Sequence, residues 1–158
     1  MVKDNNTKLI AENRKAYHEY FIEDRMEAGI ELAGTEVKSI RLGQINMGDS
    51  YAAISNGEIW LYSLHISPYE QGNRFNKDPL RTRRLLMHKR EIMKLFGIVR
   101  QEGLTLVPTK VYFKNGRVKI EIGLARGKKN YDKRDADSKK QATREIEKRL
   151  KDRSRLME

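Results

Sequence analysis

The chain has 158 residues, enough for one domain and an extension, and it contains no cysteine. Disulfides and thiolate metal sites are therefore excluded, and a reducing cytoplasm is the expected compartment. The net charge of +11 predicts attraction to a polyanion, either nucleic acid or an anionic membrane. No run of about 18 apolar residues occurs, so no segment is expected to span a bilayer. The first twelve residues lack an apolar core, so secretion is not expected.

The first predicted element is a strand within residues 20–33, because apolar and polar residues alternate there from Met26 onward. A short helix is predicted over 35–42, with Thr35 as its N-cap and Gly43 just past its end. The next signal is an Asn-Gly pair between two apolar runs, which is a strong indication of a β-hairpin. It occurs twice in the chain, first between 51–55 and 58–67, and later between 104–114 and 117–125.

Between the two hairpins, the polar segment 70–79 contains turn-forming residues and is expected to be a flexible loop. Residues 81–88 fit a strand or a helix equally well. A helix is predicted from about His88 to just before Gly103, because Ile92, Leu95, Phe96 and Val99 share one helix face.

The elements add up to five or six short antiparallel strands with two inserted helices. Two hairpins, and no spacing typical of β-α-β units, argue against a doubly wound parallel sheet. A small closed or half-closed β-barrel covers the strand edges economically. We therefore expect a mainly β fold with helices, in which two or three helices lie outside the barrel.

Positive charge is concentrated at the C-terminal end. Residues 127–158 hold 12 Lys and Arg against 7 Asp and Glu, with few large apolar residues among them. Such a segment cannot bury enough surface to offset the entropy cost of ordering. We expect a folded domain over residues 1–130 and a basic tail over 131–158 that is disordered in the free protein.

If the tail becomes helical, its cations form a ridge. On a helical wheel they fall within an arc of about 80°, opposite a thin apolar seam, and they are Lys140, Arg144, Lys148, Lys151 and Arg155. Such a ridge can lie along phosphates. A solvated charged helix is the alternative.

No catalytic set or cofactor motif is evident. The three histidines, His18, His65 and His88, lack metal-ligand spacing, and no carboxylate pair has a partner that would tune an acid–base couple. The segment NRKAYHEY interleaves cations with aromatic rings, which suits RNA, although aromatic residues beside a strand more often belong to the core. We expect a protein that is not an enzyme and binds no metal.

Several long motifs occur in one order between Asn13 and Asp135: NRKAYHEYFIE, EAGIELAGTEVKSIR, DSYA, HISPY, RTRRLLMHKREI and VKIEIGLARGKKNYDKRD. In these motifs the chain resembles the SsrA-binding protein family, also called small protein B, of bacterial trans-translation. The resemblance implies an oligonucleotide-binding-type barrel that binds the tRNA-like end of transfer-messenger RNA. It also implies entry into the decoding site of a stalled ribosome, with the tail helical in the empty mRNA channel. We expect a monomer with these partners and no membrane.

The resemblance also implies which residues meet RNA. Those on the RNA-binding face of the barrel are Asn13, His18, Glu27, Leu86 and Lys119, with Lys38, Arg41 and Lys128 as further candidates. Glu27 repels phosphate, so it is expected to accept hydrogen bonds from base or ribose groups or to orient an Arg; a structural pair with a Lys or Arg is the alternative. Leu86 is expected to stack under an unpaired base unless it belongs to the core.

The segment after the barrel is the decoding-site piece in the family, and its candidates are Tyr131, Asp132, Lys133 and Arg134. Tyr131 falls where many relatives have His, so a role that needs a titrating imidazole is not expected here. Stacking on a base remains open to either ring. Two other classes of function are weighed: a constitutive basic ribosomal protein, which composition cannot distinguish, and an RNA-processing enzyme, for which no residue set is found.

Overall fold

The computed structural model describes residues 7–70 and 76–128, together with Arg144 and Lys148, which are exposed helical positions. The chain divides into two units, Met1–Gly127 and Lys128–Glu158. Most of the expectations for the tail concern residues outside the described part: Tyr131, Asp132, Lys133, Arg134, Lys140, Lys151 and Arg155. The centre of the expected loop, residues 71–75, also lies outside it.

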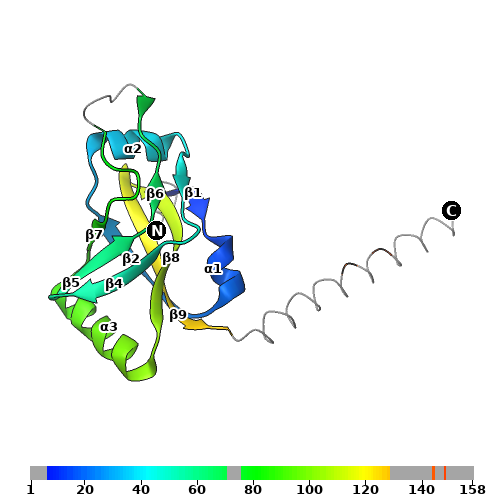
Figure 1. Ribbon diagram of the computed structural model, residues 1–158, viewed down its shortest axis with the longest axis vertical. Coiled ribbons are helices and arrows are strands. Elements are labelled where there is room, and N and C mark those ends of the chain that lie inside the picture. The colour runs from blue at the N-terminus through cyan, green and yellow to red at the C-terminus, as the bar shows by residue number, and fades with distance from the viewer. Residues whose placement is uncertain (1–6, 71–75, 129–143, 145–147, 149–158) are drawn as a thin grey trace. The chain divides into compact units, whose positions relative to one another are not determined.

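Six antiparallel strands of the first unit form a closed ring (Figure 1), which confirms the predicted barrel. In order around the ring they are β4 (Tyr51–Ser55), β5 (Glu58–Tyr62), β7 (Arg83–Leu86), β2 (Tyr20–Ile30), β9 (Arg117–Gly127) and β8 (Thr105–Lys114). A single pairing of Ala52 with Leu106 joins β4 to β8 and closes the ring. The long strands β2, β8 and β9 supply most of the pairing, and β7 is joined to β2 only at Gly29–Leu86 and Ile30–Leu85.

Two further strands were not predicted from the sequence, and the strand predicted over 58–67 is broken into two pieces at Ser63, where φ is 61°. β1 (Thr7–Glu12) pairs with the C-terminal half of β8, beyond the point where β4 leaves that edge. β3 (Ile45–Asn46) and β6 (His65–Ile66) form a separate two-stranded sheet. β3 and β6 have two residues each, too few to show a period of two, and β1 forms by pairing with β8.

Both hairpin predictions are confirmed, and the reason is local. Asn56 and Gly57 have φ values of 53° and 76°, and Asn115 and Gly116 have values of 52° and 78°. Positive φ at both central positions defines the type I′ turn, which matches the twist of the flanking strands. The second turn fixes the register of β8 on β9, so that Tyr112 lies opposite Lys119.

Three helices accompany the barrel: α1 (Arg14–Glu19), α2 (Gly34–Arg41) and α3 (Lys89–Glu102). Figure 1 shows α2 and α3 at opposite ends of the ring, and they pack Ile40 and Ile92 into the core. The prediction for α3 is confirmed. For α2 the expected cap is wrong: Ala33 is the N-cap, and the Glu36 side chain accepts a hydrogen bond from its backbone N–H at 2.9 Å.

Two buried charged residues attach α2 to β7. The guanidinium of Arg83 donates to the Glu36 carboxylate, with an Nε–Oε2 distance of 2.8 Å, and to the backbone carbonyls of Leu64 and Pro79 at 2.7 and 3.1 Å. Arg81 donates to the same carboxylate from a more exposed position. Burial by itself raises the pKa of Glu36, but the bonds from Arg81, the Ala33 backbone and Arg83 outweigh it and hold this pKa below its usual value.

Candidate nucleic-acid interface

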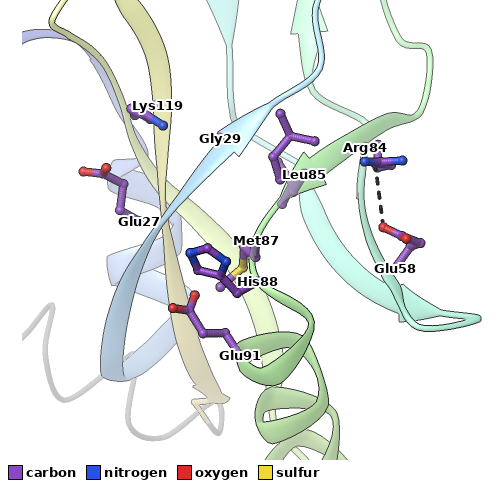
Figure 2. A pocket seen from close by; sticks show the side chains of 10 residues that line it. Glu27, Gly29, Glu58, Arg84, Leu85, Met87, His88, Glu91 and Lys119 are labelled. Carbon is purple, nitrogen blue, oxygen red and sulfur yellow. Dashed lines mark ion pairs between the residues drawn. The ribbon is translucent and has the colours of Figure 1, made fainter.

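Strands β2, β7 and β9 and the start of α3 surround an open hollow of about 520 Å³, which we call the first hollow. It brings together three of the candidates named from the sequence, namely Glu27, Leu86 and Lys119. Figure 2 shows Glu27 and Lys119 on one side and the Arg84–Glu58 ion pair on the other, with His88 and Glu91 between them.

Leu86 lies on the surface of the barrel and not in its core. Its side chain is 44% exposed, whereas that of the neighbouring Leu85 is 1% exposed, as expected for successive residues of one strand. Gly29 pairs with Leu86 in the ring, and a Cβ atom on Gly29 would come within 3.2 Å of the Leu86 Cβ. The absence of a side chain on Gly29 therefore lets β2 approach β7 closely and leaves one face of Leu86 open.

Glu27 forms a small network on the outer face of the barrel. The Tyr112 hydroxyl donates to Glu27 Oε2 at 2.6 Å, and Lys114 Nζ donates to the same oxygen at 3.3 Å. The bond from Tyr112 is the main cause that holds the pKa of Glu27 below its usual value, and Lys114 and Lys119 act in the same direction against desolvation. Glu27 is therefore a carboxylate at neutral pH. Its ion pair with Lys114 matches the alternative of a structural pair with a Lys, and its role toward RNA stays a prediction.

The two cations expected on α2 are exposed, and each lies over an aromatic ring. Lys38 Nζ is 5.4 Å from the ring centroid of Tyr69, and the Arg41 guanidinium is 5.2 Å from that of Phe113. Cation–π contacts at this distance orient a long side chain while leaving its donors available to water or a ligand. Neither residue lines the first hollow.

Asn13 and His18 belong to α1 and also lie apart from the first hollow. Asn13 is buried: its amide donates to the carbonyl of Pro108 at 2.9 Å, and its Oδ1 accepts from the backbone N–H of Ala16 at 3.2 Å. These bonds fix the start of α1 against β8, and the expectation that Asn13 meets RNA stays a prediction. His18 is exposed in the last turn of that helix.

Sequence reasoning missed Tyr112, Gly29 and Arg84. The signal for Tyr112 was available, because a two-residue turn at Asn115-Gly116 already implies that Tyr112 faces Lys119. Gly29 and Arg84 line the hollow only because β7 pairs with both β2 and β5. No local sequence pattern predicts these strand pairings. Lys128 follows β9 directly and begins the second unit.

In the described part of the chain, no helix is long and apolar enough to cross a membrane. Among the same residues, no group of three or more His, Asp or Glu side chains is placed to hold a metal ion.

A closed antiparallel barrel that presents an apolar side chain, a carboxylate and cations in one open hollow belongs to the class of small basic RNA-binding barrels. The family model described as SmpB protein matches residues 10–152, and the chain belongs to this family. This confirms the resemblance found in the sequence motifs.

The relatives support the assignment over nearly the whole chain. The SsrA-binding protein of Carboxydothermus hydrogenoformans is 67% identical over 144 residues, covering 91% of this chain and 97% of that protein. The SsrA-binding protein of Clostridium tetani is 61% identical over 155 residues, covering 98% and 99%. A solved structure described as "tmRNA-SmpB: a journey to the center of the bacterial ribosome" shares 52% identity, with a TM-score of 0.64, over 76% of this chain and 85% of that one.

Proposed function

We propose that the protein binds the tRNA-like domain of transfer-messenger RNA and delivers it to stalled ribosomes for trans-translation. The family assignment and the names of the relatives support this role. The structural observation that best supports this role is that Glu27, Leu86 and Lys119 line the same hollow. The protein acts as an adaptor without catalysis, and the partners imply the cytoplasm.

Each of the three residues suits a different part of one nucleotide. The exposed face of Leu86 is a surface on which an unpaired base can stack, as commonly occurs when proteins read single-stranded RNA segments. The Glu27 carboxylate accepts hydrogen bonds, so it reads base N–H groups or ribose hydroxyls and repels phosphate. The Lys119 ammonium suits the phosphate that follows.

Further contacts come from the surface around the hollow. His18 at the end of α1, Lys38 and Arg41 on α2, and Lys128 after β9 are placed in our proposal along the same RNA. Asn13 has a supporting role, because it fixes the helix that carries His18. The tail, including Tyr131 and the cations from Lys133 to Arg155, is proposed to enter the decoding site and the mRNA channel.

The proposal is tested by gel shift with the full chain and with a chain that ends at Tyr131. The RNAs are the tRNA-like domain of transfer-messenger RNA, an ordinary tRNA and an unrelated duplex. Both proteins are expected to prefer the tRNA-like domain, because the barrel supplies the recognition, whereas only the full chain is expected to support tagging on stalled ribosomes.

Equal affinity of the full chain for all three RNAs would contradict the proposed specificity. Loss of most RNA affinity in the shortened chain would contradict the division of roles between barrel and tail. A constitutive ribosomal protein would instead remain on free ribosomes after a high-salt wash, so the same preparations distinguish that class.

A further inference from the structure

A second hollow, of about 300 Å³, adjoins the first one between α2 and the turn of the β8–β9 hairpin. Both hollows are lined by Gly29, Leu86 and Lys119, so they meet on either side of the Leu86 side chain. Gly29 adds no side chain between the two hollows, so the side chains that they share are those of Leu86 and Lys119. A strand of RNA that stacks on Leu86 can therefore continue from one hollow into the next.

The two hollows differ in charge. Three carboxylates, those of Glu27, Glu58 and Glu91, line the first hollow together with its cations. The charged residues that line the second hollow are both cations, Arg117 and Lys119, and its remaining lining is largely aliphatic. A surface with carboxylates selects hydrogen-bond donors, whereas a surface with cations alone selects phosphate.

The hairpin turn places Arg117 at the mouth of the second hollow. Asn115 and Gly116 form the turn, and Arg117 is the first residue of β9, paired with Lys114. Gly116 also lines the hollow and adds no side chain to obstruct it. Arg117 and Lys119 take part in no ion pair with any residue in 7–70 or 76–128, whereas Lys114 is paired with Glu27. The Arg117 guanidinium is therefore available to an external anion.

We infer that the bound RNA strand continues past Leu86 into the second hollow, where Arg117 binds a backbone phosphate. This inference rests on the proposed function and adds to it a phosphate site on the β8–β9 turn. Recognition is then divided at Leu86: donor groups of one nucleotide meet the carboxylates, and the adjoining phosphate meets Arg117 and Lys119. The apolar wall formed by Leu32, Val37 and Val118 accommodates the sugar or base of the adjoining nucleotide.

The test compares Arg117→Ala, Arg117→Lys and the control Lys94→Ala, because Lys94 is an exposed cation on α3 that lines neither hollow. Affinity for the tRNA-like domain is measured from about 50 to 200 mM salt. Each phosphate contact contributes roughly 0.7 to 0.9 to the slope of log affinity against log salt. The ratio of the affinity of the unaltered protein to that of Arg117→Ala is therefore expected to fall about threefold from the lowest to the highest salt concentration. Arg117→Lys and Lys94→Ala are expected to keep the slope of the unaltered protein.

If Arg117→Ala has the same affinity and slope as Lys94→Ala, the phosphate site on the turn is refuted. Equal losses in Arg117→Ala and Arg117→Lys, with unchanged salt slopes, would also refute it, because the charge would then not matter. Melting temperatures close to that of the unaltered protein verify that the hairpin is intact. A failure of the proposed function looks different: the unaltered protein would itself not prefer the tRNA-like domain over duplex.

Discussion

At the scale of single residues, Glu27 shows how an acidic side chain can serve a surface that binds a polyanion. Its side chain is 37% exposed, and the bonds from Tyr112 and Lys114 go to the same oxygen, Oε2. Oε1 is thus available to accept from a ligand, within the described surroundings. Burial raises the pKa of the Tyr112 hydroxyl, so this group remains a donor at all physiological pH values.

The substitution Tyr112→Phe keeps the ring and removes this donor. Tyr112 orients the Glu27 carboxylate, so its loss leaves that acceptor less well placed for RNA, and affinity for the tRNA-like domain is expected to fall by up to about tenfold. The pKa of Glu27 should also rise toward its usual value. The carboxylate is charged only above its pKa. As the pH is lowered, RNA binding by the variant should therefore begin to weaken at a higher pH than RNA binding by the unaltered protein.

The measurement is an RNA affinity profile between roughly pH 4 and pH 7, around the ordinary range for Glu. Lys94→Ala serves as the control for titration of the RNA itself. Superimposable profiles for Tyr112→Phe and the unaltered protein would show that Tyr112 does not hold Glu27 in its charged state.

At the scale of elements, α2 is held on the barrel by a buried ion pair and not by apolar packing alone. Arg83 is fully buried, and it joins Glu36 of α2 to carbonyls on two connecting segments. The position of α2 in turn determines where Lys38 and Arg41 lie and forms one wall of the second hollow through Val37.

Arg83→Met tests this attachment, because methionine has a comparable volume and no charge. Removing one partner of a buried pair leaves an uncompensated charge and costs about 3–5 kcal/mol. Urea unfolding is expected to show a loss of this size, and the double variant with Glu36→Leu should recover part of it. Only part is recovered because Glu36 also accepts from the Ala33 N–H. A loss below about 1 kcal/mol in the single variant would show that α2 does not depend on this pair.

The elements also show what the sequence can predict. The hairpins were predictable because Asn-Gly turns are encoded by two adjacent residues, and α3 because its apolar stripe is long. β7 was ambiguous because its inward positions are Arg83 and Leu85, and an inward Arg hides the alternation. Arg83 is inward only because Glu36 meets it from 47 positions away. α1 was missed because its six residues are too few to show a helical period.

At the scale of the whole barrel, the sequence motifs named the candidate residues but could not assemble them. Glu27, Leu86 and Lys119 come from three strands, and only closure of the ring makes them neighbours. Of the five residues that the family resemblance placed on the RNA-binding face, these three line one hollow. Asn13 is instead buried and hydrogen-bonded at the start of α1, which no sequence motif indicates.

The central claim is that the hollows around Leu86 are the main RNA-binding surface of the barrel. It is tested most directly by methyl NMR of the Leu- and Met-labelled protein during titration with the tRNA-like domain. Leu9 and Met93 are matched controls, because they are 54% and 58% exposed and line neither hollow. We expect the methyl signals of Leu86 to shift or broaden at the first additions of RNA while those of Leu9 and Met93 stay in place. Shifts at Leu9 or Met93 with an unchanged Leu86 signal would contradict the claim.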